Sequence, residues 1–400
     1  MKKIFLSLCL SATIIQLNAQ IEWRNDRTGI YNETGLLKSW DPEGPQMLWY
    51  YDGLGEGHSS VAVSNDILYT TGMIEGKGYL YSFDTNGKVL NKLRYGDEWT
   101  ENYEGTRGTP VINDGKIYIY SGMGDLICLN EKSLEVIWKR NVIVDFDSKN
   151  ITWGVTESPL IFGDKLIITP GGKEHNVVAL DKNTGKVIWS SPALGELSAY
   201  CSPLYIGDQE VPLVVTITAH HIVGLEAATG KMLWSFASKT RNQIQSNTPI
   251  YSNNMLLCVS VDKGCTMLRL TNGGRKADIV WEIPELDNMM GGMVKIGDYL
   301  YGSDAGYKNR SWYCVNWNTG EIMWRQQGIA VGVTIYADGM LYCYSERGEM
   351  ALVKPQPDKF NIISQFMVTK GTNQHWAHPV IYKGTLYVRH GDSLIAYKIK

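Results

Sequence analysis

Eight side chains that can bind or react with a ligand recur near equivalent points of a regular pattern in this chain. They combine imidazoles, a guanidinium, a carboxylate, an amide and aromatic rings: His58, Arg107, Glu157, Tyr200, Asn247, His375, Trp376 and His378. Imidazole and phenol groups can act as general acids or bases, and an arginine can neutralise the charge of a bound molecule. If the fold brings these residues together, they form a candidate ligand or partner site. We assign no metal ligands among them.

A repeated phrase indicates which elements must position these side chains. Leu-Asp-Lys-Asn-Thr-Gly-Lys-Val-Ile-Trp ends at Trp189. Stronger and weaker copies of it end at Asn91, Trp138, Trp234, Trp281 and Trp324. A spacing of about 45 residues is typical of repeated supersecondary units.

Residues 157–189 show what one repeat contains. Short apolar runs at 158–161, 165–169, 176–180 and 186–189 are separated by turns at 163–164, 171–172 and 181–185. Gly185 suits a turn position with positive φ, and no helical period accompanies the apolar runs. Four short antiparallel strands per repeat predict the blade of a β-propeller, so the expected fold class is all-β.

The tryptophan that ends a copy has a structural role in this interpretation. It lies on the outermost strand, where its flat ring can fill the wedge between neighbouring blades. A backbone carbonyl of the next repeat can accept the indole N–H. We assign this docking role to Trp49, Trp138, Trp189, Trp234, Trp281 and Trp324.

The same position gives the number of blades. Asn91, the five tryptophans from Trp138 to Trp324 and a degraded site near Ser364 close seven blades. Three strands follow without a fourth, and residues 46–49 near the start of the chain resemble residues 231–234. We therefore predict an eight-bladed β-propeller over residues 20–400, closed by an N-terminal strand that leaves no open sheet edge.

Alignment of the repeats places the candidate residues around the axial channel of the propeller. One level holds His58, Arg107, Thr156, Tyr200, Ser246, Met290, Val331 and Trp376. A second level holds Ser60, Thr109, Ser158, Ser202, Thr248, Gly292, Val333 and His378, and Glu157, Asn247 and His375 lie beside these levels. We expect the hydroxyls of the second level to satisfy buried backbone groups at the hub. The charged residues, imidazoles and aromatic rings form the candidate channel site.

The start of the chain predicts export. Lys2 and Lys3 precede an apolar stretch that runs to Leu17, and Ala19 precedes a cleavage point, so residues 1–19 are interpreted as a signal peptide. No later apolar run approaches the ~20 residues that span a bilayer. We expect a periplasmic monomer. The formal charge of −3 does not favour a nucleic-acid partner.

Six cysteines remain after this leader, and their positions favour burial as small packed residues. Cys258 and Cys265 flank a predicted turn that pairs Val261 with Cys265, so a disulfide between them would require distortion.

The Thr-Gly-Lys-x-x-Trp phrases at 184–189 and 229–234 resemble the tryptophan-docking motif of the pyrroloquinoline quinone (PQQ)-like repeat family. The opening residues Trp23-Arg24, Arg27–Ile30 and Glu33–Trp40 resemble one subgroup of its exported members. The family includes quinoprotein alcohol dehydrogenases and BamB-like scaffolds. The resemblance covers about residues 22–400 and implies the propeller fold, but a fold hosts many functions.

Three functions are compatible with these observations. The first is a binding or scaffold module, without bound PQQ, for a protein or carbohydrate partner in the cell envelope. Short loops, a charge near neutral and aromatic residues such as Tyr103 and Trp153 favour it.

The alternatives are enzymes. A quinoprotein alcohol or sugar dehydrogenase needs PQQ and a cation, usually calcium, and Arg107, Glu157, Asn247 and Trp376 could supply parts of that site. A polysaccharide lyase or hydrolase could use His58, His375 and His378 as acid or base beside Arg107 and Tyr200.

Overall fold

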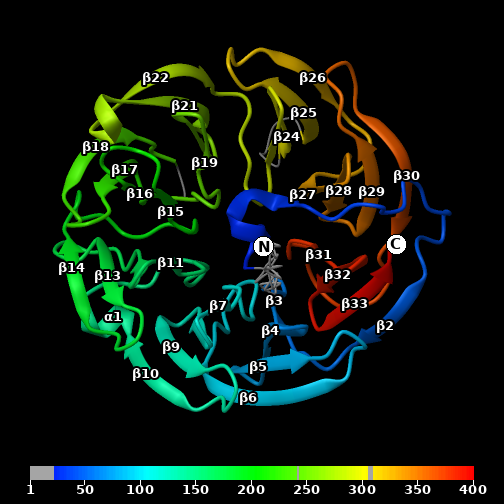
Figure 1. Cartoon of the computed structure of the whole chain (residues 1–400), viewed down its shortest axis with the longest axis horizontal. Coiled ribbons are helices and arrows are strands. Elements are labelled where there is room, and N and C mark those ends of the chain that lie inside the picture. Colours follow the sequence, from blue (N-terminus) through cyan, green and yellow to red (C-terminus); the bar gives the residue numbers. More distant parts are fainter. Residues whose placement is uncertain (1–21, 241–242, 305–309) are drawn as a thin grey trace, which may run out of the picture.

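Short strands joined by tight turns form eight separate antiparallel sheets, which are arranged as the blades of a propeller (Figure 1). The computed structural model describes residues 22–240, 243–304 and 310–400, so the predicted signal peptide lies outside the described residues. The predicted all-β, eight-bladed propeller is confirmed. In each blade the first strand lies nearest the axis and the last strand lies at the rim.

The first four blades follow the predicted order of strands. They are β3 (Ala62–Ser64), β4 (Ile67–Ile74), β5 (Lys77–Phe83) and β6 (Val89–Asp97); β7 (Val111–Asn113), β8 (Lys116–Tyr120), β9 (Asp125–Asn130) and β10 (Val136–Asn141); β11 (Leu160–Phe162), β12 (Lys165–Ile168), β13 (Val177–Asp181) and β14 (Val187–Ser191); β15 (Leu204–Ile206), β16 (Leu213–Ile217), β17 (His221–Glu226) and β18 (Met232–Ala237).

The last four blades complete the ring. They are β19 (Ile250–Ser252), β20 (Met255–Ser260), β21 (Gly264–Thr271) and β22 (Lys276–Ile283); β23 (Val294–Ile296), β24 (Tyr299–Asp304), β25 (Ser311–Asn316) and β26 (Ile322–Gln326); β27 (Gly332–Ala337), β28 (Met340–Ser345), β29 (Glu349–Lys354) and β30 (Asn361–Met367); β31 (Val380–Tyr382), β32 (Thr385–His390), β33 (Ser393–Lys398) and the N-terminal β2 (Met47–Tyr51). Helical structure in the described residues is limited to α1 (Val142–Asp145) and the single turns Asn25–Gly29 and Asn272–Gly274.

The N-terminal strand closes the ring as predicted. β2 pairs antiparallel with β33, with Trp49 opposite Ala396 and Tyr51 opposite Leu394. The last blade therefore combines strands from the two ends of the chain, so the ring can form only after most of the chain is in place.

The tryptophans of the repeated phrase join each of six blades to the next. Each indole Nε1 donates to a backbone carbonyl of the following blade: Trp49 to Thr85 (2.9 Å), Trp138 to Lys182 (3.0 Å), Trp189 to Ala227 (3.1 Å), Trp234 to Gly274 (3.1 Å), Trp281 to Trp317 (3.2 Å) and Trp324 to Gln356 (2.9 Å). These bonds link blades that otherwise meet through side-chain packing.

A β-bulge lies immediately before this docking position in all eight blades. The strand register shifts around Leu48, Leu90, Ile137, Ile188, Leu233, Val280, Met323 and Ile363. A bulge adds one residue and increases the local twist, which turns the next side chain toward the neighbouring blade. It also interrupts the exposed edge of each outermost strand and so disfavours edge-to-edge association.

An N-terminal segment in the axial channel was not predicted from the repeats. The turn Asn25–Gly29 lies at the centre of the ring, and β1 (Ile30–Tyr31) pairs parallel with β27 on the inner side of the seventh blade (Figure 1). The segment then crosses the last two blades, where Leu37 N donates to Ile399 O over 2.7 Å. We call residues 22–31 the plug. Its sequence does not belong to a repeat, so repeat alignment could not place it.

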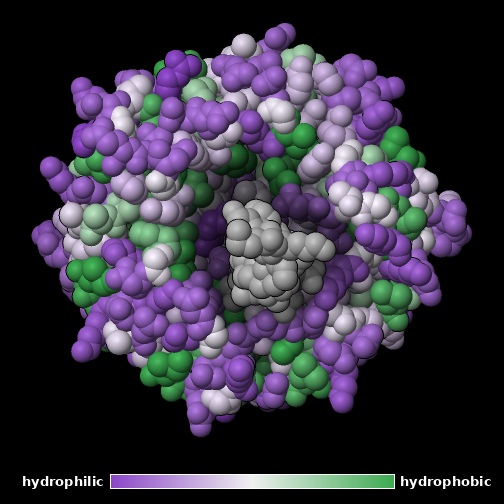
Figure 2. All heavy atoms as spheres, viewed as in Figure 1, coloured by the Kyte–Doolittle hydropathy of each residue, from purple (hydrophilic) through white to green (hydrophobic). Residues whose placement is uncertain are grey.

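Side chains on one face of the disc are mostly hydrophilic, with hydrophobic ones scattered among them (Figure 2). Within the described residues, no helix has both the length and the apolar character required to cross a membrane. The six described cysteines are free and buried. Cys265 lies opposite Val259 and Cys258 opposite Thr266, so the predicted pairing of Val261 with Cys265 was wrong by two residues.

Candidate functional site in the axial channel

The connections from the outermost strand of one blade to the innermost strand of the next surround a cavity of about 340 Å³. Five of the predicted site residues line it, namely His58, Arg107, Tyr200, Trp376 and His378. The rest of the lining consists of Trp23, Tyr103, Trp153, Thr156, Ser158, Ser202, Ile244, Ser246, Met289 and Met290. Connections that are far apart in sequence thus supply a single lining that is rich in aromatic side chains.

Three predicted site residues, Glu157, Asn247 and His375, do not line this cavity. The alternation of side chains along an extended chain explains the positions of Glu157 and Asn247. Glu157 lies between Thr156 and Ser158, which line the cavity, and Asn247 follows Ser246, which does the same. Neighbouring side chains of an extended segment point to opposite sides. Glu157 is therefore buried on the far side, where its Oε2 accepts a hydrogen bond from Thr169 N over 3.0 Å. Asn247 Nδ2 donates to Asn288 O over 2.6 Å.

His375 is turned toward the seventh blade. Its Nδ1 lies 2.5 Å from the hydroxyl of Tyr344, and its ring stacks on His390 with 3.5 Å between centroids. Burial and the neighbouring His390 lower the pKa of His375 to about 4, so the ring is neutral near pH 7. It therefore contributes to packing between the last two blades.

The hydroxyls of the second level link the blades around the hub. Ser60 N donates to Thr109 Oγ1 (3.0 Å), Thr109 N to Ser158 Oγ (3.1 Å), Ser158 N to Ser202 Oγ (2.9 Å) and His378 N to Ser60 Oγ (3.0 Å). Each bond satisfies a backbone group at the inner end of a blade, as expected for buried polar atoms.

Arg24 of the plug lies beside the part of the hub where the second level of residues has no hydroxyl side chain. Gly292 and Val333 stand there, and the Arg24 guanidinium donates to Met293 O (2.7 Å), Thr334 O (3.1 Å) and His378 Nδ1 (2.9 Å). A Cβ atom on Gly292 would lie 2.9 Å from Arg24 Nη1. The glycine thus provides the space for the arginine, which donates to backbone carbonyls in this sector.

The plug backbone is strained. Arg24, Asn25, Asp26 and Arg27 have φ values of 56°, 44°, 53° and 65°. Consecutive left-handed residues cost roughly 1–2 kcal/mol each, and such strain persists only where the surroundings enforce it. Buried Arg27 donates to Pro159 O over 2.9 Å, on the other side of the axis from the Arg24 contacts. The turn places Trp23 in the cavity lining, edge-on to His378 at 5.4 Å between centroids.

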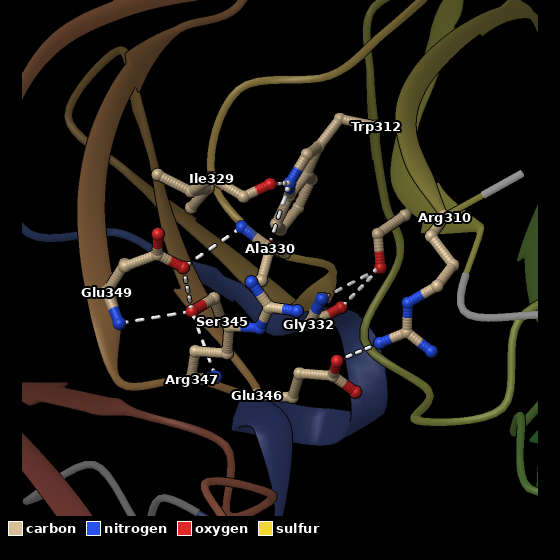
Figure 3. A network of polar contacts seen from close by, with 10 residues as sticks. Arg310, Trp312, Ile329, Ala330, Gly332, Ser345, Glu346, Arg347 and Glu349 are labelled. Carbon is tan, nitrogen blue, oxygen red and sulfur yellow. Dashed lines mark hydrogen bonds and ion pairs between the residues drawn. The ribbon is translucent and has the colours of Figure 1, made fainter.

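The connection 327–331 is held apart from the cavity by a polar network (Figure 3). Trp312 Nε1 donates to Ile329 O (3.3 Å) and Ala330 O (3.2 Å). The carboxylate Oε2 of Glu349 accepts from Ala330 N (2.9 Å) and Ser345 Oγ (2.6 Å). These bonds fix the connection against the sixth and seventh blades, which explains why Val331 is buried and does not reach the lining.

Two basic side chains in the cavity region have buried nitrogens without hydrogen-bond partners among the described residues. Both ring nitrogens of His58 and Nε of Arg107 are buried without a hydrogen-bond partner among the described residues. Burial and the charge of Arg107 lower the pKa of His58 to about 3, so this imidazole is neutral near pH 7. Burial lowers the pKa of Arg107 to about 10, which leaves the guanidinium charged. No carboxylate belongs to the lining in the described part of the chain.

The hydroxyl and aromatic side chains of the lining complete its chemistry. Thr156 Oγ1 donates to Tyr200 O (2.7 Å) and Ser246 Oγ donates to Met289 O (2.5 Å), so each oxygen keeps its lone pairs as acceptors. Trp376 packs against both His58 and Tyr103, with 5.0 Å between centroids in each pair. The lining therefore offers apolar ring faces, donors and acceptors, a combination suited to binding a small ring-shaped group.

The donor set does not match PQQ with calcium. Calcium requires several oxygen ligands, and the oxygens of Glu157 and Asn247 lie outside the lining. The described residues include no group of three or more His, Cys, Asp or Glu side chains that could hold a metal. Arg107 is the single permanently charged cation in the described lining, whereas PQQ carries three carboxylates.

Comparison with known proteins agrees with the resemblance seen in the repeats. Residues 76–326 match the model of the PQQ-like repeat family described as outer membrane protein assembly factor BamB. A quinoprotein ethanol dehydrogenase of Pseudomonas aeruginosa is 33% identical over 95 residues, which are 24% of this chain and 14% of that protein. The outer membrane protein assembly factor BamB of Shewanella oneidensis is 24% identical over 184 residues, 44% of this chain and 43% of that protein. The matched segments span less than half of either relative.

Solved structures share the propeller. BamB from Moraxella catarrhalis superposes with a TM-score of 0.66 at 16% identity, covering 89% of this chain and 100% of that one. Quinohemoprotein alcohol dehydrogenase from Comamonas testosteroni superposes with a TM-score of 0.67 at 12% identity, covering 94% and 80%. Identities this low show a common fold and do not distinguish a scaffold from a dehydrogenase.

Proposed function

The chain belongs to the PQQ-like repeat family described as outer membrane protein assembly factor BamB, and from this we infer that it is a binding or scaffold module of the cell envelope. Its partner is a protein or a carbohydrate, and part of that partner enters the axial cavity. The predicted signal peptide at residues 1–19 supports a periplasmic location.

The observation that carries this proposal is the composition of the cavity lining. Aromatic rings from the plug and from several connections surround about 340 Å³, with His58, Arg107, Thr156 and Ser246 as polar groups. Apolar walls with a few placed polar groups are typical of binding pockets. The described lining contains no carboxylate, either as a catalytic base or as a calcium ligand, although PQQ chemistry requires both. The residues therefore fit the binding of a partner without PQQ better than the binding of PQQ with calcium.

Capture of partners from an envelope extract tests the proposal. Immobilised protein spanning residues 20–400 is compared with a Trp153→Ala, Trp376→Ala double variant, which removes two aromatic walls. Val136→Ala, at an exposed position of β10 on the rim, serves as the matched control. We expect a partner or glycan that the wild type and the rim variant retain and the double variant loses. Capture that is independent of the cavity residues would contradict the proposal.

A quinoprotein dehydrogenase is the second candidate, favoured by the 33% identity to quinoprotein ethanol dehydrogenase over 95 residues. Calorimetric titration with PQQ, with and without calcium, separates the two functions. Saturable, calcium-dependent binding that weakens in Arg107→Ala would support the dehydrogenase. If no heat of binding is measured at high micromolar PQQ, the protein does not use this cofactor.

A polysaccharide lyase or hydrolase is the third candidate, because His58, His378, Arg107 and Tyr200 line one cavity. Burial and neighbouring charge lower the pKa of His58 to about 3 and hold that of His378 well below its ordinary value, so both imidazoles are neutral near pH 7. Release of new sugar ends from acidic and neutral polysaccharides, absent in His58→Gln, would establish such an activity.

A further inference from the structure

We propose that the axial cavity binds a sugar ring that carries a carboxylate, such as a uronic acid unit of a polysaccharide. This inference rests on the proposed binding function, because it names the ligand class of the same cavity. It follows from three properties of the lining, each of which demands a different part of the ligand.

The first property is the positive charge of Arg107, which has no carboxylate partner within the described lining. The buried Glu98, outside the lining, has a pKa of about 7 and so balances this charge only in part. Arg107 is charged and lines the cavity, and its Nη2 donates to the backbone oxygens of Asn102 (3.3 Å) and Tyr103 (2.5 Å). Its Nε is buried without a partner among the described residues, and so are both nitrogens of His58. Buried donors without acceptors cost free energy, and a buried cation costs more. A carboxylate in the cavity beside Arg107 would supply the opposite charge and an acceptor for the guanidinium.

The second property is a set of hydroxyl oxygens that can still accept. The protons of Thr156 Oγ1 and Ser246 Oγ are directed to the carbonyls of Tyr200 and Met289. Their lone pairs can therefore bond only to a ligand that brings donors. The hydroxyl groups of a sugar are such donors, whereas a plain aromatic carboxylate has none to offer.

The third property is the arrangement of apolar faces. Trp153 packs against Tyr200 with 5.8 Å between centroids, and Trp376 packs against Tyr103 with 5.0 Å. Met289 and Met290 add flexible apolar contacts, and Trp23 of the plug completes the lining. The C–H face of a pyranose ring can cover such aromatic surface. A volume of about 340 Å³ lies near the lower end of ligand pockets, which fits one or two sugar rings.

Neutral sugars and polypeptide segments satisfy these properties less completely. A neutral sugar leaves Arg107 with only the partial counter-charge of the buried Glu98, whose pKa is about 7. An aromatic side chain of a protein fills the apolar faces but provides few donors for Thr156 and Ser246. The acidic sugar is therefore the class that accounts for the charge, the acceptors and the ring faces together.

Isothermal titration of the protein spanning residues 20–400 tests this inference. The probes are glucuronic and galacturonic acid oligosaccharides of two to four units, with glucose and galactose oligosaccharides of equal length as neutral partners. We expect the acidic probes to bind at least about tenfold more tightly, as one charge-assisted bond provides. Added salt should weaken the acidic probes selectively.

Charge-removing variants test whether Arg107 in the cavity causes the preference for acidic probes. Arg107→Gln should weaken acidic probes about tenfold or more and leave neutral ones nearly unchanged, while Arg107→Lys should retain part of the difference. Arg94→Gln removes the same charge from the exposed rim strand β6 and should have no effect. Melting temperatures of all three variants verify that they are folded.

The outcomes separate this inference from the proposed function. Equal affinity for acidic and neutral probes, or insensitivity to Arg107→Gln, overturns the acidic ligand but leaves a binding cavity. If no sugar binds and a protein is captured only when Trp153 and Trp376 are present, the acidic ligand is also overturned and the binding cavity remains. Partner capture that ignores the cavity residues overturns the proposed function itself.

Discussion

The guanidinium of Arg24 donates a hydrogen bond to Nδ1 of His378 over 2.9 Å and so joins the plug to the last blade of the propeller. A guanidinium has only donors, so Nδ1 must be the acceptor and the ring proton of His378 lies on Nε2. Burial and the charge of Arg24 hold the pKa of His378 well below its ordinary value. The plug therefore sets the protonation state of a cavity residue as well as filling the channel.

Replacing Arg24 tests whether the plug contributes to stability. Arg24→Gln leaves the buried carbonyls of Met293 and Thr334 without their donor, and each unsatisfied group costs about 1–3 kcal/mol. We expect a loss of roughly 2–5 kcal/mol in denaturant unfolding. Lys77→Gln breaks an exposed ion pair with Asp97 and should change stability by less than about 1 kcal/mol. Equal stability of the two variants would show that the plug is dispensable.

A pair of glycines with nearly equal backbone angles, combined with Arg24→Gln, tests the packing around Arg24. Gly292 has φ +84° and would place a Cβ 2.9 Å from each of Arg24 Nη1, His378 Cε1 and Val333 Cβ, whereas Gly339 has φ +80° and would place one in open space. Both alanine variants carry the same backbone strain, so only Gly292→Ala should also displace the plug. We expect Gly292→Ala to melt at a lower temperature than Gly339→Ala. The gap should shrink when Arg24 is already Gln.

The aromatic ring of a docking tryptophan should contribute more to the free energy of unfolding than its indole N–H does. Trp189→Phe keeps an aromatic ring but removes the donor to Ala227 O, so we expect a loss of roughly 1–2 kcal/mol. Trp189→Ala also opens a cavity between two blades and should cost about 3–5 kcal/mol. Equilibrium unfolding in guanidinium chloride measures both. A Phe variant as damaging as the Ala variant would assign the effect to the hydrogen bond alone.

The buried carboxyl of Glu157 predicts a dependence of stability on pH. Burial raises its pKa to about 8 from 4.5, so the folded protein keeps a proton that the unfolded chain loses between these values. Its contribution is therefore fully present below pH 4.5 and is lost as pH rises toward 8. Glu157→Gln cannot ionise. The stability of this variant relative to wild type should rise from pH 5 to pH 8 by roughly 1 kcal/mol or more. A difference that stays constant across this range would mean that Glu157 is ionised in the folded protein.

Deleting residues 20–49 removes the plug and most of β2. The last blade then lacks most of its rim strand, and β33 loses its pairing with Met47 and Trp49. We expect a large drop in melting temperature and loss of a single cooperative transition. A truncated protein that melts like the full one would refute the closure by β2.

Local repetition explains how much of the fold could be predicted. The Val-Ile-Trp ending of the phrase specifies a strand and the residue that docks on the next blade, and its spacing of about 45 residues specifies the number of blades. The same alignment placed Ser60, Thr109, Ser158 and Ser202 at one level of the hub, where they bond neighbouring blades. It also placed His58, Arg107, Tyr200 and Trp376 at the level that lines the cavity.

The amino-acid sequence by itself thus determined the class of fold, the blade count and the ring of channel residues, because strand alternation and repeat length are encoded in neighbouring positions. Tertiary structure alone decided the positions of Glu157, Asn247 and His375. One residue along an extended chain moves the side chains of Glu157 and Asn247 off the cavity side, and contacts with Tyr344 and His390 turn His375 toward the seventh blade. Tertiary structure also decided the position of the plug in the channel. Arg24 and Arg27 donate hydrogen bonds to residues more than 130 positions away, from a left-handed turn that no repeat contains. Contacts between positions so distant depend on the closed ring, and only the closed ring brings their partners to the axis.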